Sequence, residues 1–237
     1  MKIITWNCNM AFRNKWQAVA ALNPDILVLQ ECENESRYGH AHGIPGYNEF
    51  IWVGDNPSKG LGIMSFNGYH IELLPHHHAA FKYIVPVRVT GGSPFHLFAI
   101  WAMPDKSNRL KGYVGQIWSA LQHYEPDLNE PCVLAGDWNS NAIWNHERKT
   151  GNHAHVVELL KTYGISSIYH ELNREVHGEE SQPTLYLLKQ PGKPYHLDYC
   201  FASGKMITAQ TRIEVGKFEQ WIRWSDHMPV IVDGLAL

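Results

Sequence analysis

The chain has 237 residues, of which 44% are hydrophobic and 18% are charged, and its formal net charge is −3 with histidine counted as neutral. This composition is typical of a soluble protein with a sizeable core, and the length suits a single domain over residues 1–237. The slightly negative charge disfavours a module that only binds nucleic acid, which usually carries a basic surface. It does not exclude a nuclease, whose metal ions supply positive charge at the phosphate.

The sequence shows no marker of membrane insertion or export. No apolar run approaches the roughly 18 residues that span a bilayer, and the first residues lack the charged start and apolar stretch of a signal peptide. The cysteines lie in or beside apolar runs without CxxC spacing, which favours buried thiols in a reducing compartment; they are Cys8, Cys32, Cys132 and Cys200. We therefore expect a cytoplasmic protein with no membrane span and no obligate protein partner.

Short runs rich in Val, Ile, Phe, Tyr and Trp predict β-strands along the whole chain. They cover residues 2–7, 26–30, 47–53, 61–66, 83–90, 95–101, 131–136, 184–188, 196–202, 207–213 and 228–233. Apolar residues at helical spacing predict helices over residues 12–22, 110–121 and 156–163. Asp105 or Ser107 is the expected cap of the second helix, and Gly164 is expected to end the third. Many strands with few helices predict an α/β (α+β) sandwich, two sheets face to face with helices outside.

Five of the strand-like runs end on a carboxylate or an amide, at places spread from one end of the chain to the other. A polar group at the end of a buried strand is costly unless it is paired or bound to a cation. Several of them gathered at one place would form an oxygen-rich pocket for a hard divalent cation. The residues concerned are Asn7, Asn9, Glu31, Asp137, Asn139, Asp198, Asp226 and His227.

Each of these motifs alone has a simpler interpretation. Glu31 could be an exposed carboxylate at the end of its strand. Asp137 and Asn139 share a face if their segment is extended, but GDWN could equally be a turn. Asp198 could hold one ring nitrogen of His227 and fix its tautomer, whereas the SDH sequence could be an ordinary cap.

Taken in order, the motifs TWNCN, LQE, GDWNSN, HLDY and SDHMP resemble those of the endonuclease/exonuclease/phosphatase superfamily. The resemblance covers nearly the whole chain. It implies a four-layered sandwich with two mixed β-sheets face to face. It also implies deoxyribonuclease-like hydrolysis of phosphoesters that depends on Mg²⁺, with Mn²⁺ as a possible substitute.

The resemblance also implies roles for individual residues. Glu31 resembles the principal metal ligand of the family, with Asn9 and Asp226 as further metal-side groups. Asp137 resembles the residue that orients or deprotonates the attacking water, and Asn139 stands beside it on the phosphate.

Three more roles follow from the same resemblance. Asn7 is similar to the family's pocket asparagine. His227 resembles the histidine that contacts the phosphate oxygen, and Asp198 resembles its carboxylate partner.

Three further residues are expected to bind substrate: Trp101, Trp138 and Asn141. Trp101 stands where relatives carry a histidine or a tyrosine, and an indole cannot act as an acid. It could instead be a core aromatic residue.

The expected function is a Mg²⁺-dependent phosphodiesterase, with DNA as the favoured substrate. Two alternatives stay open. One is a phosphatase or phospholipase of the same superfamily that acts on a small phosphoester or lipid headgroup. The other is an inactive scaffold that keeps the fold and binds a partner. An inactive scaffold has no chemical reason to keep four costly polar groups together, which argues against this alternative; the four are Glu31, Asp137, Asp198 and His227.

Overall fold

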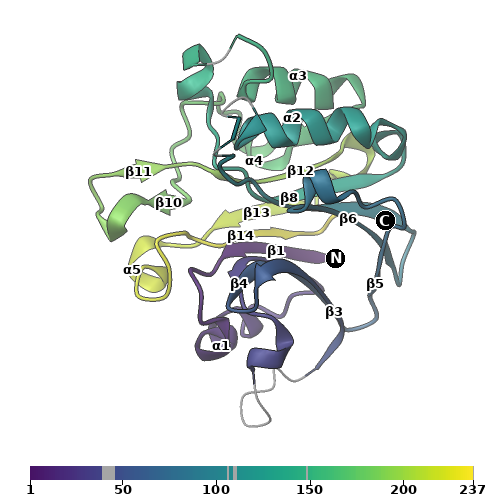
Figure 1. Cartoon of the computed structure of the whole chain (residues 1–237), viewed down its shortest axis with the longest axis vertical. Helices are drawn as coiled ribbons and strands as arrows, with labels where there is room; N and C mark the ends of the chain where they lie inside the picture. Colours follow the sequence, from purple (N-terminus) through teal and green to yellow (C-terminus); the bar gives the residue numbers. More distant parts are fainter. Residues whose placement is uncertain (39–45, 106, 109–110, 148, 237) are drawn as a thin grey trace.

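Two six-stranded β-sheets form the centre of the computed structural model, which describes residues 1–38, 46–105, 107–108, 111–147 and 149–236 (Figure 1). The first sheet has the strand order β13–β14–β1–β2–β4–β3. Its strands are β1 (Lys2–Asn7), β2 (Ile26–Cys32), β3 (Tyr47–Asn56), β4 (Lys59–Phe66), β13 (Arg212–Val215) and β14 (Val230–Asp233). The pair β1–β2 is parallel and the other pairs are antiparallel, so the sheet is mixed.

The second sheet has the order β5–β6–β7–β8–β12–β9 and is also mixed, because only β7 and β8 run parallel. Its strands are β5 (His70–Leu73), β6 (Ile84–Thr90), β7 (Phe95–Trp101), β8 (Cys132–Asp137), β9 (Ile165–Ser167) and β12 (Asp198–Ser203). A small hairpin of β10 (Leu185–Tyr186) and β11 (Pro194–Tyr195) projects from the sheets (Figure 1).

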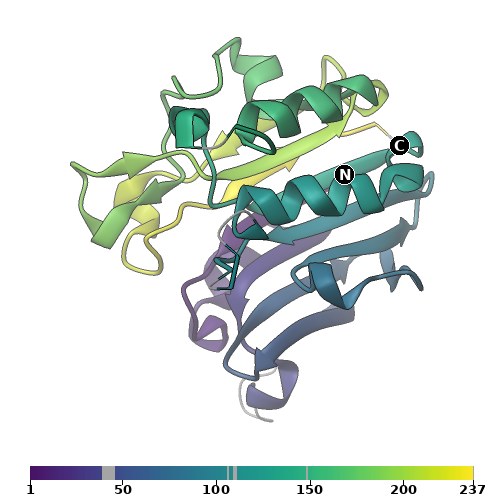
Figure 2. The same ribbon diagram turned by 45° about the horizontal axis from the view of Figure 1, so that its top comes forward.

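The helices are α1 (Trp16–Ala20), α2 (Val114–His123), α3 (His153–Thr162), α4 (Ile168–Asn173) and α5 (Phe218–Trp221). All but α4 lie on the outer faces of the two sheets (Figures 1 and 2). Helix α4 instead contacts β9 and β12 of the second sheet and β13 of the first, and its Ile168 enters the core between the sheets. Ile117 of α2 and Leu160 of α3 pack on the outer face of the second sheet, and Val19 of α1 packs on the outer face of the first.

Alternation along each strand separates the layers. Ile3 enters the core between the sheets, whereas Ile4 enters the outer core under α1. The same alternation sends Val133 inward and Leu134 toward the helices. The expected four-layered sandwich is therefore confirmed, with buried strands in both sheets because each sheet is covered on both faces.

Several predicted elements differ from the structure. The strand predicted over 207–213 lies at Arg212–Val215, because Thr208 and Thr211 form a turn in which the Thr208 amide donates to Thr211 Oγ1 at 2.9 Å. The strand predicted over 184–188 keeps only Leu185–Tyr186. The short elements β5, β9 and α4 had no sequence signal.

The predicted helices also differ at their ends. The helix predicted over 12–22 divides into a 3₁₀ turn and the short α1. The cap at Asp105 or Ser107 is wrong: α2 starts at Val114, and Asp105 instead accepts hydrogen bonds from the Ser107 and Asn108 amides. Residue 110 of that prediction lies outside the described residues. Gly164 follows α3 with φ +67°, as expected for a helix end.

The topology brings the polar strand ends to one end of the molecule. Asn7 and Gln30 are partners at the carboxyl ends of parallel β1 and β2, and Trp101 and Asp137 are partners at the carboxyl ends of parallel β7 and β8. Asp198 opens antiparallel β12 directly opposite Asp137. In Figure 1 this is the end of β1 away from the N label, toward the β10–β11 hairpin.

A last observation on the fold concerns membranes. In the parts of the chain that the structure describes, every helix is too short or too polar to cross a bilayer.

Candidate active site

Asp137 lies at the centre of the polar group. It is 1% exposed at the end of β8. Its Oδ2 accepts hydrogen bonds from the side-chain amides of Asn7 and Asn139, both at 3.0 Å, and its Oδ1 accepts from the Asn139 backbone amide at 2.9 Å. Asn139 has φ +44°, so GDWN forms a turn after the strand and not a continued strand. The turn, one of the alternatives from the sequence, brings the two side chains together.

Asp198 and His227 form a buried pair beside Asp137. Asp198 Oδ2 lies 2.8 Å from His227 Nδ1, and one carboxylate oxygen or ring nitrogen from each of Asp137, Asp198 and His227 lies within 4.8 Å of the other two. Thr184 fixes the start of β12, because its Oγ1 accepts from the Leu197 and Asp198 amides at 2.8 and 3.0 Å.

The Asp198–His227 pair leaves two atoms without a hydrogen bond among the described residues, His227 Nε2 and Asp198 Oδ1. Among the described residues, no hydrogen bond of His227 Nε2 is found, so the pairing with Asp198 leaves this ring nitrogen for a ligand. The second oxygen of Asp198, Oδ1, is buried without a hydrogen-bond partner in the same residues. A buried carboxylate oxygen without a donor is costly, which indicates a place for a water or ligand donor.

Burial and charge shift the pKa values of this group in ways that suit acid–base chemistry. Desolvation raises the pKa of Asp137 to about 7, and the Asp198 carboxylate adds to the rise, while His227 and the amide of Asn7 oppose it. For His227, burial acts to lower the pKa, but the carboxylates of Asp198 and Asp137 outweigh it and raise it to about 10. The site therefore holds a carboxylate able to accept a proton next to a cationic imidazole.

Glu31 lies at an irregularity in β2, one residue after the ladder partner of Asn7. The pairing of β2 with β4 shifts register between Gln30 and Cys32, and Glu31 between them has φ +58°. Such a bulge turns one side chain out of the strand's alternation. The Glu31 carboxylate lies 3.0 Å from Lys59 Nζ, and that ammonium lies 5.6 Å from the ring centroid of Trp101.

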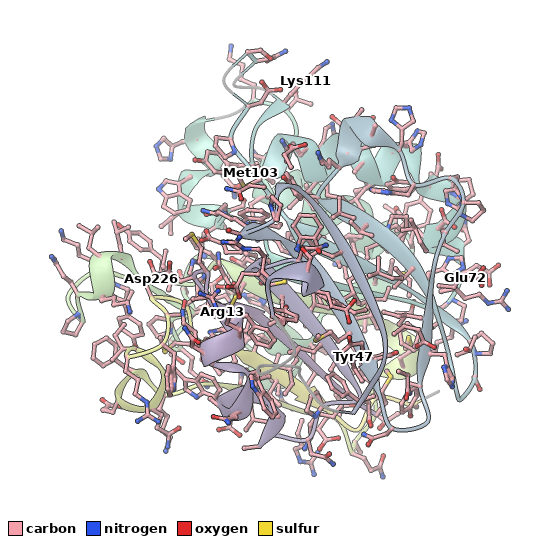
Figure 3. The ribbon with its side chains drawn as sticks, turned by 60° about the horizontal axis from the view of Figure 1, so that its bottom comes forward. Arg13, Tyr47, Glu72, Met103, Lys111 and Asp226 are labelled. Atoms are coloured by element: carbon pink, nitrogen blue, oxygen red, sulfur yellow. The ribbon has the colours of Figure 1, made fainter. Side chains whose placement is uncertain are left out.

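Asn9 and Asp226 meet at the rim of the same end. The Asn9 side-chain amide donates to Asp226 Oδ1 at 3.2 Å, and the Asn9 backbone amide donates to Asn7 Oδ1 at 3.1 Å. Lys15 donates to the carbonyl oxygens of Cys8 and Asn9, which fixes the turn after β1. Figure 3 shows Asp226 on the side of the molecule away from Glu72 of β5.

The donor types at this end fit Mg²⁺. Glu31 and Asp226 supply carboxylates, and Asn9 keeps its side-chain oxygen because its amide nitrogen is the atom that binds Asp226. Carboxylate and amide oxygens are the ligands that hard divalent cations prefer. Lys59 neutralises Glu31 in this arrangement, so a cation on Glu31 has to compete with an ammonium group.

The structure corrects the expected substrate-binding roles of Trp138 and Asn141. Trp138 is fully buried and stacks on Phe201 with ring centroids 4.7 Å apart, so it belongs to the core under the helices and presents no face to a substrate. The Asn141 side chain is also buried, and its amide lies within hydrogen-bonding distance of Glu180, the His196 carbonyl and Tyr199. Asn141 therefore fixes loops and does not face substrate.

Trp101 belongs to the core between the sheets. It is 2% exposed and makes an edge contact with Tyr83 at 4.9 Å between centroids. The structure thus gives the core alternative for Trp101, whose backbone is the ladder partner of Asp137 and whose ring lies under Lys59 Nζ.

Sequence reasoning missed three residues of the site: Lys15, Lys59 and Thr184. Lys59 starts β4 after a short turn, and the sequence DNPS before it is typical of an ordinary loop. Thr184 lies just before β10, and only the fold brings its hydroxyl to Asp198. Contacts between residues that are far apart in the sequence, such as those of Lys59 with Glu31 and of Thr184 with Asp198, leave no local sequence pattern from which to predict them.

Comparisons with known proteins agree with this geometry. The model of the Endonuclease/Exonuclease/phosphatase family matches residues 4–227. No curated protein sequence matches this chain. Among solved structures, the 3'-5' exonuclease NExo from Neisseria meningitidis is similar with a TM-score of 0.64, 20% identity and coverage of 100% of both chains.

Two other solved structures are similar over nearly their full length. An AP endonuclease from Archaeoglobus fulgidus has a TM-score of 0.68 and 16% identity over 99% of both chains. TDP2 from D. rerio, complexed with a single-strand DNA product, has a TM-score of 0.66 and 19% identity over 98% of this chain and 97% of that one. These likenesses show the shared fold, and the family match covers every motif from β1 to His227. The chain belongs to the Endonuclease/Exonuclease/phosphatase family and is a phosphoester hydrolase.

Proposed function

We propose that this protein is a Mg²⁺-dependent phosphodiesterase that hydrolyses DNA, and that Mn²⁺ can replace Mg²⁺. The observation that carries the proposal is the placement of Asp137. It is buried, oriented by two asparagines and next to the Asp198–His227 pair. A single domain over residues 1–237 would contain the whole site.

The residues of the chain divide the chemistry between them. Asp137, with a pKa near neutrality, accepts the proton of the attacking water. Cationic His227 donates from Nε2 to a phosphate oxygen and stabilises the charge that develops there, while Asp198 holds the ring. Asn7 and Asn139 keep the Asp137 carboxylate in one orientation.

Glu31, Asn9 and Asp226 would hold the cation, which supplies neutralisation of the phosphate charge when bound. The chain's own net charge of −3 makes such neutralisation necessary near a polyanion. DNA is favoured as substrate because similar structures were solved with DNA: NExo, named there a 3' phosphatase, with a product DNA hairpin, and TDP2 with single-strand DNA product.

The test compares substrates and metals with one preparation. Supercoiled plasmid, single-stranded DNA, a 3'-phosphorylated oligonucleotide, RNA and bis-p-nitrophenyl phosphate are incubated with Mg²⁺, Mn²⁺ or EDTA. We expect cleavage of DNA that requires Mg²⁺ or Mn²⁺. Release of phosphate from the oligonucleotide without strand cleavage would make the protein a phosphatase. Turnover that persists in EDTA, or no turnover on any substrate, would overturn the proposal.

Asp137→Asn separates catalysis from folding. We expect a fall in kcat of about 10²–10⁴-fold, the usual contribution of a positioned base. The circular dichroism spectrum should be unchanged, because asparagine keeps the shape of the side chain. Wild-type turnover in this variant would remove Asp137 from the mechanism.

A further inference from the structure

A second cluster of metal-ligating side chains lies apart from the residues assigned to catalysis. It contains His170 of α4 and two residues of the segment that follows, His177 and Glu180. One ligand atom from each lies within 4.8 Å of the other two. The side chains of His170 and Glu180 are 9% and 3% exposed, so the group is largely shielded from water.

Neighbouring side chains hold these rings in fixed orientations. Ser167 Oγ lies 2.7 Å from His170 Nδ1, which leaves His170 Nε2 facing Glu180 at 3.1 Å. The rings of His170 and His177 stack with centroids 3.5 Å apart. His153 Nε2 lies 3.0 Å from His177 Nδ1. The hydrogen-bonding contacts with Ser167 and His153 are of the kind that orients ligating imidazoles in natural metal sites.

We propose that His170, His177 and Glu180 form a binding site for Zn²⁺ or a similar divalent transition-metal ion, separate from the Mg²⁺ site. Two imidazoles and one carboxylate suit zinc, whereas an ion such as Mg²⁺ prefers oxygen ligands alone. The fourth position of a tetrahedral ion is left to water, with His153 as the hydrogen-bonding neighbour of His177.

The bound ion would fix the segment that supports the catalytic pair. This segment, residues 174–184, ends at Thr184, whose hydroxyl binds the Asp198 amide and whose carbonyl accepts from the Met228 amide at 2.6 Å. Glu180 also accepts from Asn141, four residues after Asp137. The proposed role is therefore structural: the ion would join α4 to the segment 174–184, which contacts Asn141 through Glu180 and Asp198 through Thr184.

The binding test uses the full chain stripped of metal and then titrated with Co²⁺ and Zn²⁺ in excess Mg²⁺. Co²⁺ with imidazole ligands in a tetrahedral site absorbs visible light far more strongly than Co²⁺ in an octahedral oxygen site. We expect one equivalent of strongly absorbing Co²⁺ that Zn²⁺ displaces. His177→Gln and Glu180→Gln should each lose this equivalent.

Two further variants serve as controls. Glu31→Gln should retain the signal, because it alters only the proposed Mg²⁺ site, and so should His123→Ala, which removes an exposed histidine of α2. Zn²⁺ should also raise the melting temperature of the wild type by several degrees, but not that of His177→Gln. Equal binding by wild type and His177→Gln, or a weak octahedral spectrum in the wild type, would overturn the proposal. Because the readout is binding, it is independent of any nuclease activity.

Discussion

Asp137 and His227 carry opposite charges in the active state, and burial acts against both charges. Asp137 must lose its proton to serve as base, and its pKa is raised to about 7. His227 must keep its proton, and its pKa is raised to about 10. Below the first pKa the base is protonated, and above the second the imidazole is neutral. Full activity therefore needs a pH between the two.

We therefore expect kcat/KM to rise as pH increases toward about 7 and to fall again as pH approaches about 10. The measurement is the pH profile of bis-p-nitrophenyl phosphate hydrolysis at saturating Mg²⁺. His227→Gln should lower the rate and remove the alkaline decline, because glutamine does not titrate. A maximum near pH 5 in the wild type would contradict the assigned roles.

The ammonium group of Lys59 forms an ion pair with Glu31, the carboxylate that we propose binds the cation. Partly exposed ion pairs contribute about 0.2–1 kcal/mol, and Lys59 is 36% exposed at its side chain. Lys59→Gln should therefore lower the Mg²⁺ concentration for half-maximal activity, by up to about fivefold. The matched control is Lys2→Gln, which removes a lysine paired with Asp233 at the other end of β1. An increased Mg²⁺ requirement would mean that Lys59 assists the cation or the phosphate.

At the scale of elements, β7 and β8 approach closely at Gly136, which has φ +153°. A Cβ at this position would lie 1.9 Å from the Ile100 carbonyl oxygen. Gly136→Ala must push the strands apart and should cost about 2–5 kcal/mol of unfolding free energy. It should also reduce activity, because Asp137 is the next residue.

Gly164→Ala is the control for the glycine conformation alone. Gly164 has φ +67°, and a Cβ at this position would meet no atom within 4 Å among the described residues. Its substitution should cost only about 1–2 kcal/mol and leave kcat unchanged. Urea unfolding and steady-state kinetics of both variants check this pair. Equal destabilisation would show that the β7–β8 contact is not the cause.

The same elements show what a sequence can predict here. Asn7, Asp137 and Asp198 were predicted at one place, because each ends or opens a buried apolar run and such ends meet in a sandwich. Trp138 was misplaced, since alternation predicts a face but not whether helices cover that face. The bulge that redirects Glu31 depends on pairing between β2 and β4, which no local pattern encodes.

For the whole molecule, the active site exists only while the two sheets are packed together. The first sheet supplies Asn7 and the second supplies Asp137, and the hydrogen bond between them crosses the interface at 3.0 Å. Asp198 of the second sheet likewise pairs with His227, which precedes β14 of the first. We therefore expect enzymatic activity to be lost whenever the two sheets separate, so that activity follows unfolding as closely as tryptophan fluorescence does.

Leu97→Ala tests this dependence from a distance. Leu97 is fully buried between the sheets, paired with Val133 near the start of β7, at the end away from Trp101. Deleting its side chain should cost about 2–5 kcal/mol and lower the urea midpoint, yet leave kcat and KM near wild type without urea. In both proteins, loss of activity and loss of tryptophan fluorescence should occur at the same urea concentration. Activity lost well before fluorescence would show instead that the site opens while the sheets remain packed.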